Sequence, residues 1–242
     1  MTDSNPKGER IAKVIARAGV CSRRDAERLI ADGRVTLNGI ELNSPAVNVT
    51  ADDVVLVDGK PIPVAQKPRL WRYHKPAGLV VTNRDPEGRP TVFDLLPKNL
   101  PRVLSVGRLD IRSEGLLLLT NDGELARKLE MPATGWIRHY RVKVHGIPDG
   151  NALASLADGI TVDGTRYRPI KAETERILSG TAWVSFALKE GKNREIRRVC
   201  DHLGLRVIRL IRTSYGPFKL GNLVRNEAEE VPGSIIARYI PF

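Results

Sequence analysis

The segment VGRLDIRSEGLLLLTND, residues 106–122, decides how the second half of this 242-residue chain folds. Its four leucines, 116–119, form a short apolar run between polar residues, which predicts a buried strand rather than a helix. Asp110 precedes this run and lies between Arg108 and Arg112. Such an aspartate is either an ion-paired structural residue or a carboxylate kept ionised by positive charge, able to act as nucleophile or base. The segment alone leaves both interpretations open.

Positive charge is concentrated in particular regions. The formal net charge is +11, with 28% charged and 5% aromatic residues. Residues 1–66 are balanced overall, yet their cations gather before residue 35. These cations include Arg10, Lys13, Arg17, Arg23, Arg24, Arg28 and Arg34. Clustered positive charge is typical of proteins that bind nucleic-acid phosphates, and a merely solvated surface is the alternative explanation.

Several classes of protein lack their sequence signals here. Cys21 and Cys200 form no Cys-x-x-Cys motif, so a disulfide framework or zinc site is not expected. The four histidines show no ligand spacing, and neither an NTPase phosphate loop nor a hydrolase nucleophile elbow occurs. Residues 1–9 are polar, and no apolar run approaches the ~20 residues of a membrane span. These patterns predict a cytoplasmic protein without a metal or a membrane partner.

The N-terminal region predicts two helices and a small sheet. Residues 10–18 have one apolar and one basic face, and Ser22 with Asp25 has the form of a capping box opening a second helix. Asn38-Gly39 predicts the turn of a hairpin, and residues 54–62 predict another. The result is a compact module of about sixty residues.

This module resembles an S4 RNA-binding domain. The resemblance rests on KVIARAGVCSRRDAE at residues 13–27 and GRVTLNG at 33–39. It implies that residues 8–66 form the domain and that its helix pair docks on structured RNA by shape and phosphate contacts. The side chains expected to bind RNA are Arg10, Lys13, Arg17, Arg23, Arg24 and Arg28.

Prolines between residues 61 and 68 predict a linker, after which a second domain spans 70–242. Residues 71–82 predict two strands joined by a Pro-Gly turn, and further strands are predicted at 103–106, 138–145 and 183–188. Helices are predicted after Asp122, at 149–157 and along the stripe that contains Ile196, Val199 and Cys200. Tyr140 falls on the inward face of its strand, where a core aromatic is the commoner role. The fold class expected is α+β, with a mixed, mainly antiparallel sheet and flanking helices.

Ordered motifs in this second domain resemble the RsuA/RluB branch of the pseudouridine synthases. They are YHKPAG (73–78), GRLD (107–110), SEGLLLLTNDG (113–123), HYRV (139–142), EGKNREIRR (190–198) and LIRTSYGP (210–217). The resemblance extends from residue 8 to about residue 220. It implies an isomerase that acts on ribosomal RNA and converts one uridine to pseudouridine without a cofactor.

The same resemblance implies a role for several residues. Asp110 is expected to be the catalytic acid, Tyr140 to stack on the flipped-out base, and Arg197 to pair with Asp110. Arg108 is expected to position the substrate, whereas Arg112 is interpreted as surface charge. Further RNA contacts are expected from Lys192, Arg194 and Arg198. Arg194 and Glu195 depart from the His and Gln common in relatives, which we expect to alter RNA contacts but not catalysis.

Three alternatives stay open at this point. The target could be small-subunit (16S) rather than large-subunit (23S) rRNA, although the loop at residues 83–90 resembles the RluB side. A non-catalytic rRNA-binding assembly factor is the second alternative, and the presence of Asp110, Tyr140 and Arg197 argues against it. A metal-dependent nuclease is disfavoured by the lack of clustered acids. We expect a monomer, and residues 222–242 are uninformative.

Overall fold

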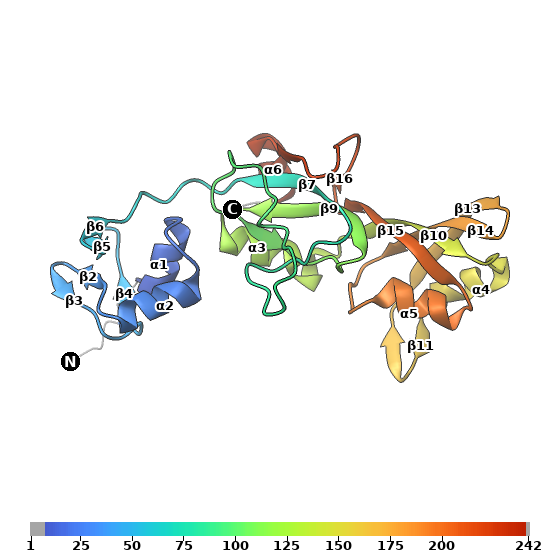
Figure 1. Cartoon of the computed structure of the whole chain (residues 1–242), viewed down its shortest axis with the longest axis horizontal. Helices are drawn as coiled ribbons and strands as arrows, with labels where there is room; N and C mark the ends of the chain where they lie inside the picture. The colour runs from blue at the N-terminus through green and yellow to red at the C-terminus, as the bar shows by residue number, and fades with distance from the viewer. Residues whose placement is uncertain (1–7, 241–242) are drawn as a thin grey trace. The chain divides into compact units, whose positions relative to one another are not determined.

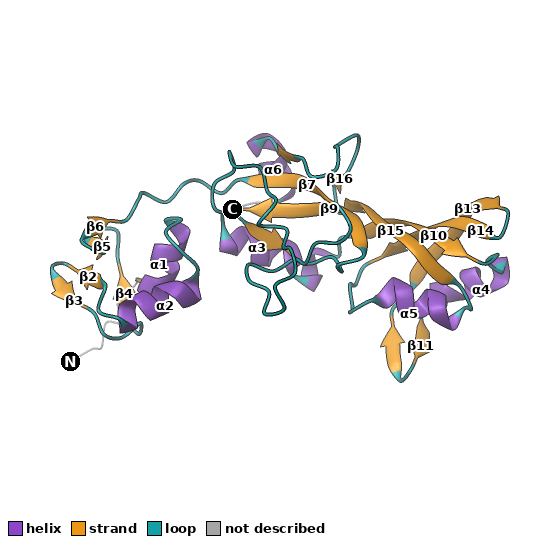
Figure 2. Cartoon of the chain, in the orientation of Figure 1, coloured by secondary structure: helices purple, strands orange, loops and turns teal. Residues whose placement is uncertain are grey.

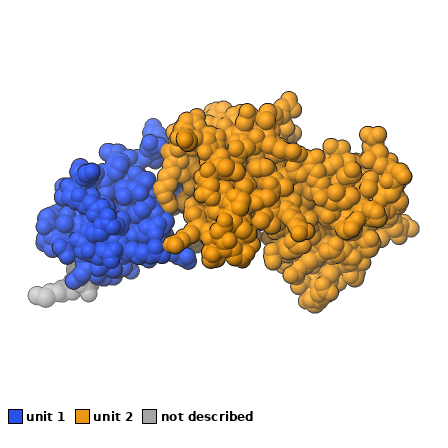
Figure 3. Space-filling model, viewed as in Figure 1, with its two compact units in different colours: residues 1–68, 121–123 blue, residues 69–120, 124–242 orange. Residues whose placement is uncertain are grey.

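A computed structural model describes residues 8–240 of the protein. Its chain divides into two compact units, residues 1–68 with 121–123 and residues 69–120 with 124–242 (Figure 3). The domain ranges predicted from the sequence, 8–66 and 70–242, stay predictions, and Pro241 and Phe242 of the second range lie outside the described residues. Each unit has a hydrophobic core of its own.

The N-terminal unit contains the predicted helix pair and hairpins. Helix α1 (Ile11–Arg17) ends before Gly19, and α2 (Arg23–Ala31) begins at the Ser22 cap, whose Oγ accepts a hydrogen bond from the Asp25 amide at 3.1 Å. A four-stranded sheet has the order β3-β2-β5-β6, and a two-stranded sheet pairs β1 with β4. These strands are β1 (Glu9–Arg10), β2 (Val35–Leu37), β3 (Ile40–Glu41), β4 (Asn48–Val49), β5 (Val55–Val57) and β6 (Lys60–Pro61).

The second unit is built on a nine-stranded sheet whose main path runs β13-β14-β10-β15-β9-β7-β17 (Figures 1 and 2). Only β15 and β9 pair in parallel along this path, so the prediction of a mixed, mainly antiparallel sheet is confirmed. The strands are β7 (Leu70–Lys75), β8 (Leu104–Val106), β9 (Ser113–Thr120), β10 (Arg138–His145), β13 (Ile170–Leu178), β14 (Thr181–Leu188), β15 (Arg206–Tyr215), β16 (Phe218–Lys219) and β17 (Ala228–Glu230). A separate hairpin joins β11 (Ile160–Val162) and β12 (Thr165–Tyr167).

Strand β9 explains the four consecutive leucines, because successive side chains of a strand point to opposite faces. Leu117 and Leu119 belong to one core cluster, and Leu116 and Leu118 to another. The first cluster includes residues of α4 (Gly150–Ser155) and α5 (Glu195–His202), and the second includes residues of α3 (Gly123–Glu130) and α6 (Gly233–Tyr239). Both faces of β9 are therefore covered, which accounts for its uninterrupted burial.

Gly115 allows β9 to approach β15 closely. The residue has φ +104 and pairs in register with Arg212. A Cβ at position 115 would lie 2.3 Å from the Arg212 carbonyl oxygen. Only glycine fits both the backbone conformation and this contact. The glycine thereby sets the position of the loop that precedes β9.

Parts of the second unit differ from the sequence prediction. The second strand expected within 71–82 is wrong, since Val80 makes only an isolated bridge to Thr91. Strand β13 was not predicted because it lies at the sheet edge, where most of its side chains are exposed and no apolar alternation marks it. The C-terminal β17 and α6 also lacked a sequence signal. The strand predicted at 138–145 is confirmed with the same bounds.

Candidate active site

A cleft of about 930 Å³ opens in the second unit beside the loop that joins β8 to β9. Its walls come from that loop, from β10 and β15, and from the start of α5. The loop is shaped by Gly107, which has φ +66 and donates its amide proton to Glu130 Oε1 at 2.7 Å. Asp110, Tyr140 and Arg197 all line the cleft. Three residues that are distant in the sequence thus share one site.

Asp110 lies in the last turn before β9. Its carbonyl oxygen accepts a hydrogen bond from the Ser113 amide at 2.9 Å, which closes the turn. Its side chain is 28% exposed and faces the cleft wall. The neighbouring Arg108 and Arg112 are exposed and make no ion pair with it. Asp110 is therefore not clamped by the two arginines that adjoin it in the sequence.

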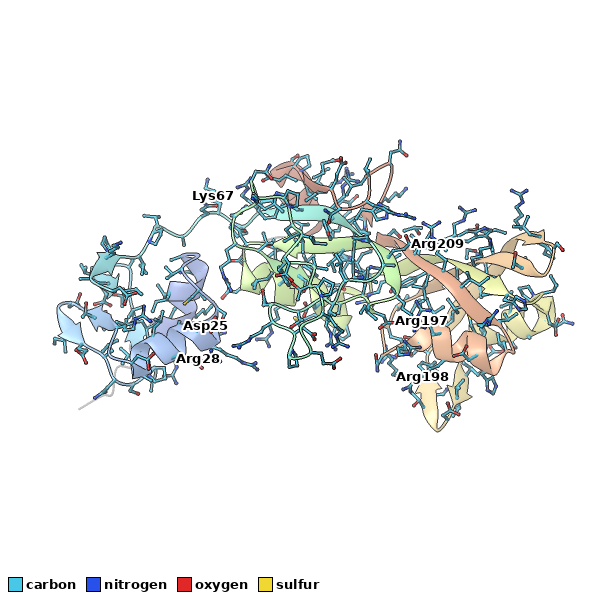
Figure 4. The ribbon with its side chains drawn as sticks, in the orientation of Figure 1. Asp25, Arg28, Lys67, Arg197, Arg198 and Arg209 are labelled. Atoms are coloured by element: carbon cyan, nitrogen blue, oxygen red, sulfur yellow. The ribbon has the colours of Figure 1, made fainter. Side chains whose placement is uncertain are left out.

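Arg197 is the cation that meets Asp110. Its Nε lies 3.6 Å from Asp110 Oδ2, and its Nη2 donates to the Arg112 carbonyl at 3.1 Å and to Ser113 Oγ at 3.3 Å. Arg197 occupies α5 and is almost fully buried (Figure 4). Burial lowers the pKa of this guanidinium, and the charge of Asp110 opposes that shift. The side chain holds both the carboxylate and the backbone that carries it.

The side chain of Lys75 binds the backbone of the same loop. Nothing in the spacing of the sequence predicted this role. The residue ends β7 and is completely buried. Its Nζ donates to the carbonyls of Pro76 at 3.0 Å, Asp110 at 3.3 Å and Ser113 at 2.8 Å. Burial lowers the pKa of Lys75 to about 8, and the negative charges of Asp110 and Glu114 limit the shift. The ammonium group thus ties β7 to both ends of the Asp110 turn.

Tyr140 belongs to the core and to the cleft at once. Its side chain extends from β10 and is 9% exposed, and it packs in the cluster that contains Phe186 and Leu210. The register of β10 and β15 places Tyr140 opposite Arg212. The tyrosine is held firmly enough by core packing to offer part of its ring as a fixed wall of the cleft.

The basic residues predicted near the site differ in their surroundings. Arg108 and Arg194 are exposed and line the cleft, and Arg194 is the left-handed residue that precedes α5. Lys192 also lines the cleft, and its ammonium group binds Glu190 at 3.3 Å and the Arg166 carbonyl. Arg198 is exposed on the next position of α5 but does not line the cleft (Figure 4). Of these four basic residues, Arg198 alone therefore lies away from the cleft.

The basic residues predicted to bind RNA in the N-terminal unit also fall into two groups, those that form ion pairs and those that do not. Lys13 and Arg17 bind Glu9 at 2.7 and 2.5 Å, and Arg28 binds Asp25 at 3.1 Å (Figure 4). Arg10, Arg23 and Arg24 are exposed and, among residues 8–240, form no ion pair. Among the described residues, no carboxylate therefore offsets the charge of these three arginines.

Glu195 is a buried acid at the rim of the same cleft. Its Oε2 accepts a hydrogen bond from the Lys192 amide at 2.9 Å, whereas its Oε1 has no hydrogen-bond partner. Burial raises the pKa of Glu195 to about 7, and the negative charge of Glu190 adds to the shift. The sequence had marked this position only as a departure from relatives.

Within residues 8–240, no group of three or more His, Cys, Asp or Glu side chains is arranged to hold a metal ion. In the same part of the chain, no helix has the length and apolar character needed to cross a membrane.

Comparison with known proteins defines the class to which this fold and site belong. The sequence model of the family described as RNA pseudouridylate synthase matches residues 69–202, and that of the S4 domain matches residues 9–55. The chain belongs to the RNA pseudouridylate synthase family and carries an S4 domain at its N-terminus. It is an RNA pseudouridine synthase, an isomerase, as the sequence motifs predicted.

Individual relatives agree with this assignment. A Rickettsia bellii protein described as an uncharacterized RNA pseudouridine synthase is 52% identical over 92% of this chain and 96% of its own length. A Yersinia pestis protein named ribosomal large subunit pseudouridine synthase B is 40% identical over 88% of this chain and 69% of its own length. The crystal structure of a pseudouridylate synthase, 27% identical, superposes with a TM-score of 0.67 over 96% of this chain and 100% of that chain.

Proposed function

We propose that this protein converts a specific uridine of large-subunit rRNA to pseudouridine, with Asp110 as the catalytic acid. The observation that carries the proposal is the ion pair between Asp110 and Arg197, with Tyr140 on the same cleft. The choice of large-subunit RNA is supported by the Yersinia pestis relative and by one from Pasteurella multocida with the same name, 42% identical over 90% of this chain. We further propose that it acts in the cytoplasm as a monomer.

The site suits an isomerisation in which no atom is added overall. The bond from ribose C1′ to uracil N1 breaks, the uracil turns, and C1′ joins C5. C5 then gives up its proton, and N1 takes up a proton. Asp110 supplies the nucleophilic carboxylate for this exchange. Arg197 keeps that carboxylate aimed into the cleft through its bonds to Arg112 and Ser113. The ring of Tyr140 supplies the surface on which the flipped base stacks.

RNA binding is divided between the two units. Residues 8–66 form the S4 domain, which binds structured RNA. Residues 70–242 form the catalytic domain. In the S4 domain, Arg10, Arg23 and Arg24 provide the principal phosphate contacts, because neighbouring acids already neutralise the other cations of the helix pair. At the cleft, Arg108 and Arg194 hold the strand that carries the target.

Mapping of pseudouridines across rRNA tests the proposal. Cells with and without this protein are compared at every uridine of both subunits. We expect one or a few large-subunit positions to lose pseudouridine when the protein is absent. Loss confined to small-subunit RNA would overturn the choice of target, and an unchanged map of both RNAs would overturn the assignment to rRNA.

A further inference from the structure

Arg212 is a buried cation in the wall of the cleft that the reaction outlined above does not use. It lies on β15, is 3% exposed, and lines the cleft together with Asp110 and Tyr140. Arginine is seldom buried to this degree unless its charge is paired. The surroundings of this guanidinium therefore need an explanation.

The protein satisfies only part of the Arg212 side chain. Its Nε donates to the Leu116 carbonyl at 2.8 Å, and its guanidinium carbon lies 5.3 Å from the centroid of the Tyr215 ring. Its Nη2 is buried and has no hydrogen-bond partner. Among residues 8–240, Arg212 forms no ion pair with a carboxylate. A buried, unpaired N–H donor costs free energy, and the ring offsets this cost only in part.

The position of Arg212 determines what can reach Nη2. Arg212 is the cross-strand partner of Tyr140, and such side chains are about 5 Å apart at their Cβ atoms. A base stacked on the Tyr140 ring would present its edge to the neighbouring guanidinium. Arginine has donors only, so the edge that it binds must offer an acceptor. The uracil edge carries two carbonyl oxygens, O2 and O4.

We propose that Arg212 binds the target base and donates a hydrogen bond from Nη2 to a carbonyl oxygen of the uracil. This inference rests on the proposed function, since it requires a uridine in the cleft. The bound base supplies the acceptor that the chain lacks. Arg212 is thereby a substrate-binding residue that holds the uracil while Asp110 acts on the sugar or the base.

A double-mutant cycle between protein and RNA tests the contact. Wild type, Arg212→Met and Arg212→Lys are assayed in single turnovers on an RNA fragment that contains the mapped target. The target carries uridine, 2-thiouridine or 4-thiouridine, because sulfur accepts hydrogen bonds weakly. Arg206→Met, an exposed arginine of the same strand, is the matched control.

We expect one thio substitution to lower the single-turnover rate of the wild type and of Arg206→Met by about 10-fold or more. Arg212→Met should react slowly on uridine, and the same thio substitution should not lower its rate further. The sulfur that matters identifies O2 or O4. Arg212→Lys keeps the charge, so it gives a second folded variant, and we expect it to lose most of the thio discrimination. Thermal melting measures whether each variant is folded.

Equal thio effects in wild type and both Arg212 variants would overturn the inference. The alternative, that Arg212 binds a phosphate, is tested with RNA that carries a methylphosphonate at the target nucleotide. If the effects of the Arg212 variants are non-additive only with the methylphosphonate, and additive with both thio substitutions, the inference is also overturned. These failures are distinct from failure of the proposed function, in which the wild type would form no pseudouridine on the uridine fragment.

Discussion

Asp110 forms its ion pair with Arg197, at 3.6 Å, rather than with Arg108 or Arg112, which adjoin it in the sequence. The partner comes from α5, whose first turn is anchored by the hydrogen bond between the Lys192 amide and Glu195. Arg197 also donates to the backbone of the Asp110 loop. One buried guanidinium therefore fixes both the carboxylate and the loop that carries it.

Replacement of Arg197 tests this double role. We expect Arg197→Met to lower kcat by about 100-fold or more while RNA affinity changes only a few-fold, because the carboxylate loses its alignment. Arg197→Lys keeps the cation but lacks the planar fork, so it restores part of the rate. Single-turnover rates and filter binding give the two quantities. A drop in affinity as large as the drop in rate would contradict a positioning role.

Lys75→Met is expected to lower the free energy of unfolding by about 1–3 kcal/mol, since it leaves buried carbonyls without a donor. The same change loosens the Asp110 turn and reduces the rate of pseudouridine formation. Urea unfolding and an activity assay measure both effects. Lys171→Met, at an exposed ion pair with Glu173, is the control and should change stability little. Equal stability of the two variants would refute the role assigned to Lys75.

The exposed arginines of α2 are expected to contact phosphates. Replacing Arg23 and Arg24 by alanine should weaken rRNA binding at low salt and reduce the slope of log affinity against log salt by about 1 for each side chain. The rate at saturating RNA should stay within a few-fold of wild type. Titrations at several salt concentrations provide the slope. Affinity and slope that match wild type would show that α2 does not meet the phosphate backbone.

Glu195 should make stability depend on pH. Its pKa is raised from 4.5 to about 7, so the folded protein retains a proton that the unfolded chain releases. Stability is therefore highest below about pH 4.5 and declines until about pH 7. We expect Glu195→Gln to remove this decline and to gain on the order of 1–3 kcal/mol relative to wild type between pH 5 and pH 8. A constant difference across that range, measured by urea unfolding, would refute the assignment.

Local features of the fold were predictable because their causes are local. The Ser22 cap, the Asn38-Gly39 turn and the alternation of 138–145 each depend on residues that adjoin in the sequence, and the structure confirms all three. Strand β13 was missed because it lies at an edge with mostly exposed side chains. Patterns of burial cannot reveal a strand that is scarcely buried.

The candidate site was predictable only in part. The pairing of Asp110 with Arg197 came from the family resemblance, since nothing in their spacing indicates contact. The burial of Lys75 and Arg212 could not be foreseen, because charged side chains are ordinarily exposed. Their positions result from the close approach of β9 to its neighbours, which Gly115 permits. Contacts of this kind depend on sheet register, which composition and periodicity do not specify.

The central claim is that Asp110 performs the chemistry, and Asp110→Asn tests it most directly. The variant is compared with wild type and with Asp201→Asn, which alters an exposed aspartate of α5, in assays of pseudouridine formation and rRNA binding. We predict that Asp110→Asn forms no pseudouridine yet binds rRNA within a few-fold of wild type, while Asp201→Asn behaves as wild type. Retained turnover by Asp110→Asn would contradict the claim.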